Sequence, residues 1–258
     1  MRRPSFSPLS LVRLASGQAS LFLLALGFLS RLAPPRQADN ARMAASVFYY
    51  PLAGLCIGLL CALPAWAGLW SGRPLVQAWL YVLLSAWLTR ALHLDGLADV
   101  LDAVGSGKRG EAFRAVLKDS RVGAFGVAGI TLALCGQAFL AASALEAGLV
   151  APLVFAPLYG RCLPIVIASL SSPYAGAGLG VLLAAASRAR CLSFACAAAL
   201  IGGLVCLGPG AFALTLLFTL PPLLFLIRLA REEGGYNGDF LGFAIVGGEL
   251  AALLACLT

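Results

Sequence analysis

Long apolar stretches separated by short polar segments recur along the whole 258-residue chain. Each stretch is near or above the roughly 18 residues that mark a candidate transmembrane helix. A chain inside lipid must satisfy its own backbone hydrogen bonds, which favours helices. The candidate spans are residues 16–31, 44–69, 75–93, 122–145, 149–169, 191–208, 211–228 and 240–257. We therefore predict an all-α, polytopic integral membrane bundle of about seven or eight spans, with residues 1–258 forming a single transmembrane catalytic domain.

Basic residues gather in alternate polar segments, and this pattern indicates the orientation of the bundle. They occur in residues 31–42, 95–121, 171–190 and 228–239, whereas the other connections between spans hold only Arg73 and Glu146. If the spans alternate in direction, the basic segments share one side, which the positive-inside rule makes cytoplasmic. We expect a multi-pass protein of the bacterial cytoplasmic (inner) membrane with its active-site loops on the cytoplasmic side.

The N-terminal segment conflicts with this orientation. Arg2, Arg3 and Arg13 would fall on the opposite side if residues 16–31 cross the membrane. That segment is therefore a span, a re-entrant segment or a helix in the membrane interface.

Composition narrows the possible chemistry. The chain is 61% hydrophobic and only 11% charged, far from the average soluble domain. Its net charge of +7 suits the membrane topology first, and no nucleic-acid partner is expected. The eight cysteines occur singly, without a CxxC pair or partner histidines, so they should be small buried apolar residues and not zinc ligands.

The stretch "HLDGLADVLDA", residues 93–103, places three aspartates beside the only histidine of the chain. On a continuous helix Asp95, Asp99 and Asp102 fall within an arc of roughly 60°. Such a stripe needs a counter-charge. It could be Arg90, Lys118 or Arg121 in a salt-bridged loop, or a divalent metal. Because oxygen-only ligands suit magnesium, and bound magnesium often contacts substrate phosphates, the metal alternative indicates a phosphoryl or pyrophosphate substrate.

Other polar residues extend this candidate site. His93 is either a polar residue at a span end or a general base. Lys118, Asp119 and Arg121 in "VLKDSRVGAFG" are either a positive-inside anchor or groups that contact phosphate oxygens. Asp239 suits a helix cap as well as a site. Glu249 follows ten residues later, roughly 15 Å along a helix, and should face the bundle interior or a watery cavity.

Several motifs together resemble the cobalamin synthase family, the adenosylcobinamide-GDP ribazoletransferases. They are "FLSRLAPP", "YYPLAGLCIG", "TRALHLDGLADVLDA", "LKDSRVGAFG" and "GGYNGDFLGFAIVGGE", in this order over nearly the whole chain. The resemblance implies a magnesium-dependent membrane enzyme that joins adenosylcobinamide-GDP to α-ribazole or its 5′-phosphate and releases GMP. The lipid bilayer is an expected partner, and a homo-oligomer and other cobalamin-assembly enzymes are further candidate partners.

On this resemblance we assign roles to the matching positions. The expected magnesium ligands are Asp95, Asp99 and Asp102, and the expected catalytic residues are His93, Lys118, Asp119 and Arg121. The expected substrate-binding residues are Arg31, Arg90, Arg161, Asn237, Asp239 and Glu249. The chain departs from the usual family pattern at Ala103, at Asn237 and at Val246, where the family usually has glycine, threonine and often glutamate.

Two other functions remain open from the residues alone. A CDP-alcohol phosphotransferase also uses membrane aspartates and magnesium, but "DGLAD" lacks the AR step of that pattern. A cation or corrinoid transporter would also explain carboxylates inside the membrane.

Overall fold

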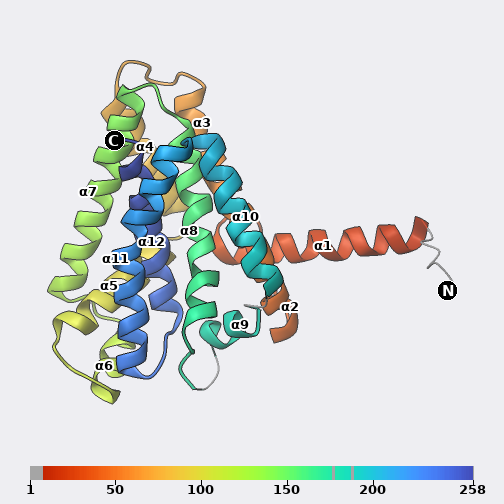
Figure 1. Ribbon diagram of the computed structural model, residues 1–258, viewed down its shortest axis with the longest axis vertical. Coiled ribbons are helices and arrows are strands. Elements are labelled where there is room, and N and C mark those ends of the chain that lie inside the picture. The colour runs from red at the N-terminus through yellow and green to blue at the C-terminus, as the bar shows by residue number, and fades with distance from the viewer. Residues whose placement is uncertain (1–7, 176–177, 187–188, 258) are drawn as a thin grey trace.

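The computed structural model describes residues 8–175, 178–186 and 189–257, which fold into helices joined by short connections (Figure 1). The helices are α1 (Pro8–Leu29), α2 (Asn40–Ser46), η1 (Val47–Tyr49), α3 (Tyr50–Trp66), α4 (Pro74–Leu88), α5 (Leu92–Gly105), α6 (Glu111–Leu117), α7 (Ala124–Glu146), α8 (Ala151–Leu170), α9 (Leu179–Ala186), α10 (Ala189–Cys206), α11 (Pro209–Glu233) and α12 (Gly238–Ala255). Pairing between extended segments is limited, in these residues, to one isolated bridge between Pro173 and Tyr236.

Six helical segments of the described chain are long and apolar enough to cross a membrane. They are residues 40–66, which join α2, η1 and α3, and the helices α7, α8, α10, α11 and α12. The helices α4 and α5 pass the same test only as a pair, giving up to seven spans, and they meet at an angle of 87°. The predicted all-α membrane bundle is confirmed, with six spans, or up to seven, in place of the seven or eight expected.

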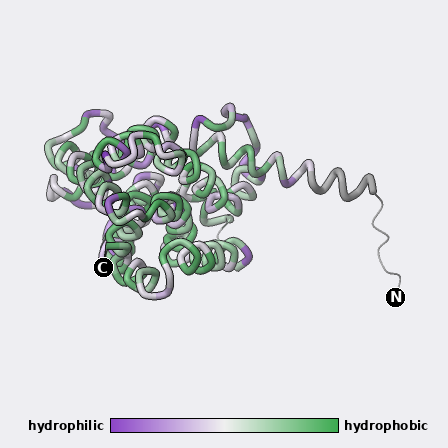
Figure 2. The backbone as a smooth tube through the Cα atoms, turned by 90° about the horizontal axis from the view of Figure 1, so that it is seen from above, coloured by the Kyte–Doolittle hydropathy of each residue, from purple (hydrophilic) through white to green (hydrophobic). Residues whose placement is uncertain are grey.

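The first apolar segment is not among these spans of the described residues. Its apolar part, Ser16–Leu29, is shorter than the six spans. In Figure 1, and again in the perpendicular view of Figure 2, α1 projects sideways from the bundle. This arrangement agrees with the interfacial alternative. Arg2 and Arg3, which raised the conflict over orientation, lie outside the described residues.

Many large apolar side chains are exposed on the outside of the bundle, and most of the helical backbone in Figure 2 has the green of apolar residues. Leu132 on α7 and Val205 on α10 are 74% and 78% exposed. A helix that is apolar all round is suited to lipid. The prediction that the cysteines are buried is confirmed for three of them and wrong for two exposed ones, while the other three are partly buried. The buried ones are Cys61, Cys162 and Cys191, the exposed ones Cys135 and Cys196, and the partly buried ones Cys56, Cys206 and Cys256.

The helix α8 forms the centre of the bundle, with 83% of its apolar stretch buried. It packs most extensively against α3 and α12. A Cβ atom on Gly54 or Gly58 of α3 would collide with the backbone of Pro157 or Val154. Small residues that let two backbones touch are a common basis of helix association in lipid.

A sharp turn between α4 and α5 sets the direction of the aspartate helix. Arg90 and Ala91 have positive φ angles of 57° and 54°, an unusual conformation for residues other than glycine. The turn ends α4 at Leu88, before the predicted end of that span, and starts α5 at Leu92. It therefore separates the aspartate stripe from the span that precedes it.

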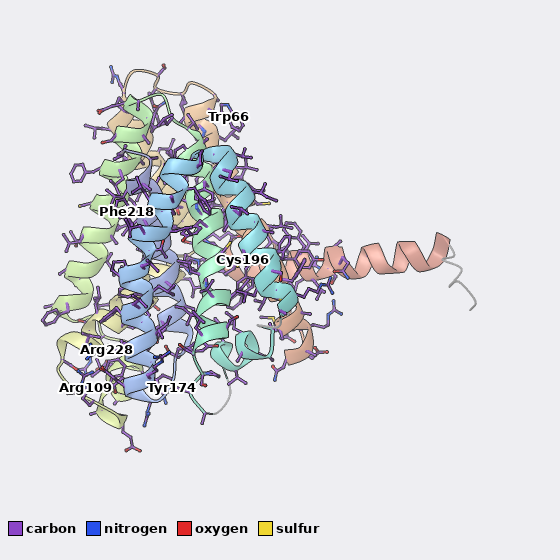
Figure 3. All side chains as sticks on the ribbon, in the orientation of Figure 1. Trp66, Arg109, Tyr174, Cys196, Phe218 and Arg228 are labelled. Atoms are coloured by element: carbon purple, nitrogen blue, oxygen red, sulfur yellow. The ribbon has the colours of Figure 1, made fainter. Side chains whose placement is uncertain are left out.

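Most basic segments lie at one end of the bundle. The connections from α5 to α7 and from α11 to α12 lie at the lower end in Figure 1, and those from α3 to α4 and from α7 to α8 at the upper end. Arg109, Tyr174 and Arg228 mark the lower end in Figure 3, and Trp66 the upper. The alternation of strongly basic and weakly charged connections in the sequence predicts that the basic segments lie at the same end.

Candidate active site

The helix α5 brings its aspartates against the start of α12. Asp95 is exposed, Asp99 is partly buried, and Gly96 between them is buried. A Cβ atom on Gly96 would lie only 2.9 Å from the Cα atom of Asp239. The glycine in "DGLAD" therefore allows the two helices to touch, and the contact adds Asp239 to the aspartate group.

The clustered carboxylates repel one another. Asp99 is close enough to Asp239, Asp95 and Asp102 for each of their charges to act on it. Within the described chain, the ion pairs are made by other acids, and no basic side chain lies within ion-pair distance of Asp95, Asp99 or Asp239. The salt-bridged loop considered for the stripe is therefore not present in these described residues.

Asp102 has a different environment from Asp95 and Asp99. Its two carboxylate oxygens accept hydrogen bonds from the backbone N–H groups of Gly123 and Gly126, at 2.7 and 2.8 Å. A Cβ atom on either glycine would collide with this carboxylate. Asp102 therefore caps the N-terminus of α7, where a negative charge is favourable.

The donor set fits magnesium better than a softer metal. Among the described side chains, no three His, Cys, Asp or Glu residues form a cage that could hold a metal ion. Magnesium needs no such cage, because one or two carboxylates and substrate phosphates commonly hold it. Asp95 and Asp99 supply oxygen ligands without a counter-ion among the described residues, so they fit a hard divalent cation.

His93 lies between two cavities. It lines a cavity of 100 Å³ together with Asp95 and Asp239, and a cavity of 20 Å³ together with Arg161 and Glu249. The imidazole is only 6% exposed. Its Nε2 atom has no hydrogen-bond partner among the described residues. That nitrogen remains available to a substrate or to water.

Arg161 and Glu249 form an ion pair inside the bundle. Arg161 is completely buried, Glu249 is 5% exposed, and Gln137 donates a hydrogen bond of 2.8 Å to the carboxylate. The predicted interior position of Glu249 is confirmed. Their 20 Å³ cavity holds about one water molecule. This geometry favours a structural role over the predicted direct contact with substrate.

Arg31 and Arg90 tie the end of α1 to the turn after α4. Arg31 donates from Nε to the carbonyl oxygen of Trp87 at 2.8 Å and lies over its ring. Arg90 donates from Nη2 to the carbonyl oxygens of Gly27 and Phe28, at 3.1 and 2.6 Å. Both arginines thus have backbone partners, and their predicted substrate contacts stay predictions.

The loop after α6 carries the other predicted catalytic residues. Arg121 donates two side-chain hydrogen bonds to Asp119, at 2.9 and 2.7 Å, and these bonds lower the pKa of Asp119 to about 2. Lys118 and Arg121 are exposed. The loop ends at Gly123, whose backbone N–H donates a hydrogen bond to the Asp102 carboxylate. The charges of this loop are therefore anchored to the aspartate helix.

Comparisons with known proteins show the family of this chain. A family model described as cobalamin-5-phosphate synthase matches residues 21–257. The chain belongs to the cobalamin-5-phosphate synthase family. It is 43% identical over 249 residues to the adenosylcobinamide-GDP ribazoletransferase of Nitratidesulfovibrio vulgaris (strain Miyazaki F), with 96% of this chain and 99% of that protein covered. No solved structure matches.

Other members of the family also match over most of this chain. A protein of the same name from Nitratidesulfovibrio vulgaris (strain DP4) is 43% identical, over 90% of this chain and 95% of its own. Another, from Syntrophobacter fumaroxidans, is 39% identical, over 81% of this chain and 84% of its own. The similarity to this family thus includes both the aspartate helix and the last span.

Asn237, and not Asp239, caps the last helix of this family member. The Asn237 side chain accepts a hydrogen bond from the backbone N–H of Asp239 at 3.2 Å and donates one to its carboxylate at 2.6 Å. The cap thereby orients the Asp239 carboxylate. Val246, a departure from the usual family pattern, lines the 20 Å³ cavity with Arg161 and Glu249.

Sequence reasoning missed Glu233. This residue is 2% exposed and accepts hydrogen bonds from the N–H of Gly110 at 2.7 Å and from Arg109 at 2.9 Å, while its carbonyl oxygen accepts one from Arg114. These hydrogen bonds fix the loop before α6 to the end of α11. No signal in the sequence indicates this role, because Glu233 follows Glu232, and consecutive acids at a helix end usually indicate a solvated surface.

Proposed function

We propose that this protein joins adenosylcobinamide-GDP to α-ribazole, or to its 5′-phosphate, and releases GMP. The products are adenosylcobalamin or its 5′-phosphate. Membership of the family and the name of its relatives support this reaction. The observation that carries the proposal is the group of carboxylates Asp95, Asp99 and Asp239, without a described counter-ion, at the basic end of a membrane bundle.

The reaction is a phosphoryl transfer. The 5′-hydroxyl oxygen of the ribose forms a bond to the phosphorus next to cobinamide. The bond between that phosphorus and the oxygen of the GMP phosphate breaks, and GMP takes the electron pair. The hydroxyl proton must leave. Such a reaction depends mainly on positioning and on neutralising charge around the reacting oxygens.

Magnesium is part of the proposal. Asp95 and Asp99 would hold the ion, and Asp239 lies close enough to assist. When bound, magnesium neutralises charge on the pyrophosphate oxygens. Asp102 has both oxygens engaged in its cap, which makes it the least available of the three predicted ligands.

The remaining roles follow from chemistry and exposure. His93 can accept the hydroxyl proton, because its Nε2 atom has no partner among the described residues and the side chain lines the cavity of Asp95 and Asp239. Lys118 and Arg121 are exposed cations that can contact phosphate oxygens. Asp119 holds Arg121 and has too low a pKa to act as a base.

We also propose the bacterial cytoplasmic membrane as the location, with the aspartate end facing the cytoplasm. The basic residues of the loops at that end support this orientation. A homo-oligomer and contacts with other cobalamin-assembly enzymes stay predictions.

The direct test is product formation by the purified protein in lipid nanodiscs. Adenosylcobinamide-GDP and α-ribazole should give adenosylcobalamin and GMP in equal amounts, and EDTA should stop the reaction. Well-folded protein that makes no product would refute the proposal. CDP-activated phospholipid donors and corrinoid uptake into sealed vesicles would then test the phosphotransferase and transporter alternatives.

A further inference from the structure

A small cavity opens beside the aspartates and runs into the bundle. It measures 100 Å³ and lies where α1, α3, α5, α8, α9 and α12 meet. Asp95 on its lining is exposed, whereas Leu29 and Ile245 are only 2% and 3% exposed. The cavity therefore has an acidic rim near solvent and an apolar floor.

The walls of this cavity are mostly apolar and partly aromatic. They include Phe28, Leu29, Pro164, Leu179, Leu183 and Ile245. Aliphatic cavities of about 150 Å³ are known to take a single benzene ring. At 100 Å³ the present cavity is smaller than that, so it can take only the edge of a flat ring that enters from the exposed rim, and it is far too small for a corrin ring.

Two buried polar atoms belong to residues of the same lining. The hydroxyl oxygen of Tyr50 and the Nε2 atom of His93 have no hydrogen-bond partner among the described residues. Tyr50 is 2% exposed and His93 is 6% exposed. Because buried polar groups are normally satisfied, these two atoms indicate a ligand or water with few polar atoms of its own.

We propose that this cavity binds the apolar edge of the base of the acceptor nucleoside, a flat benzimidazole-type ring system that enters from the rim. The inference rests on the proposed function and specifies which part of which substrate enters the bundle. Once it carries ribose, a benzimidazole has an apolar outline and one free ring nitrogen, and the Tyr50 hydroxyl can contact that nitrogen. Guanine carries several donors and acceptors on its edge, and apolar walls would leave most of them unsatisfied.

This placement also orders the two substrates. With the edge of the base against the apolar floor, the attached ribose lies at the rim, where Asp95 and Asp239 lie. The 5′-hydroxyl then meets the activated corrinoid at the carboxylates. The larger hollows of 650 and 520 Å³ contain none of Asp95, Asp99 or Asp239 in their linings, so they do not offer this arrangement.

The helix α9 provides a matched pair of variants. Leu179 lines the 100 Å³ cavity, while Leu182 lines the 650 Å³ hollow, and both are partly buried. Leu179→Trp should fill the cavity from its rim. We expect it to raise the KM for α-ribazole at least tenfold and to change the KM for adenosylcobinamide-GDP less than twofold. Leu182→Trp should leave both KM values unchanged.

Tyr50→Phe provides a second test, again through the KM for α-ribazole, that does not depend on how a tryptophan packs. It removes one hydroxyl group and should raise the KM for α-ribazole several-fold, again without effect on the corrinoid. Wild-type protein should also use an unsubstituted benzimidazole riboside well and an adenine α-riboside poorly, because adenine adds polar edge groups.

The outcomes separate this inference from the proposed function. Wild-type protein that makes no adenosylcobalamin would refute the proposed function itself. Wild-type activity with an unchanged KM for α-ribazole in both Leu179→Trp and Tyr50→Phe would overturn only the base site. A rise confined to the KM for adenosylcobinamide-GDP would overturn it too, since the cavity would then bind part of that substrate.

Discussion

Gly96 of α5 and Asp239 of α12 are in backbone contact, because a Cβ atom on Gly96 would approach the Asp239 carbonyl oxygen to 2.8 Å. Gly242, one turn further along α12, packs in the same way against His93. This contact joins two segments that are far apart in the sequence. It explains why the acidic site includes residues from both.

Gly96→Ala should therefore disturb the site without removing a polar group. The added methyl group forces α5 away from α12, and such overpacking costs about 1–3 kcal/mol. We expect a lower melting temperature in detergent and at least a tenfold lower turnover. Gly17→Ala is the matched control, since nothing lies within 4 Å of a Cβ atom at that helical glycine. Native activity in Gly96→Ala would show that the contact does not position the carboxylates.

Asp102 should behave as a helix cap. Asp102→Ala removes the acceptor for Gly123 and Gly126, and the loss of such a cap costs about 0.5–2 kcal/mol. Hydrogen exchange at the start of α7 should become faster. Asp102→Asn keeps one acceptor oxygen and should retain substantial turnover. An inactive Asp102→Asn protein with native exchange would instead identify Asp102 as a magnesium ligand.

The buried pair Arg161 and Glu249 should contribute to stability as a unit. Arg161→Met leaves the Glu249 carboxylate buried without its partner, and breaking a buried pair costs about 3–5 kcal/mol. The double variant Arg161→Met with Glu249→Gln removes both charges and should recover most of that loss. Unfolding in detergent measures both proteins. Equal stability of the single and double variants would mean that the pair is not coupled.

Asp119 should not control the pH dependence of the reaction. Hydrogen bonds from Arg121 lower the pKa of Asp119 to about 2, so this carboxylate is ionised at every pH above that value and loses its charge only as the pH falls through it. We expect kcat/KM for Asp119→Asn to show the same apparent pKa values as wild type between about pH 5 and 9. A limb of the profile that disappears in this variant would make Asp119 an acid or base.

The sequence predicts the general architecture because lipid leaves few alternatives. Apolar stretches of span length must form helices, and the basic loops indicate which ends lie together. The acidic stripe on α5 follows from helical spacing alone. Glu249 is predictable as an interior residue for a similar reason, since an acid deep in a span needs a partner.

The details that depend on contacts between distant segments could not be predicted. The spacing of Asp102 places it in one stripe with Asp95, but its carboxylate is engaged by the start of α7. The turn at Arg90 and Ala91 uses an uncommon backbone conformation that neither residue type signals. The sequence shows a glycine at position 96, but only the contact with Asp239 explains why a larger residue would not fit there.

The central claim is that Asp95 and Asp99 form a magnesium-dependent phosphoryl-transfer site. The most direct measurement is the rate of adenosylcobalamin formation by wild type, Asp95→Asn and Asp99→Asn in nanodiscs, as magnesium is raised to saturation. Both substitutions remove ligand charge and leave size unchanged, so insertion and melting temperature should stay native. We predict that turnover is lost in both variants at all magnesium concentrations. A rate above about a tenth of the wild-type rate at saturating magnesium would contradict the claim.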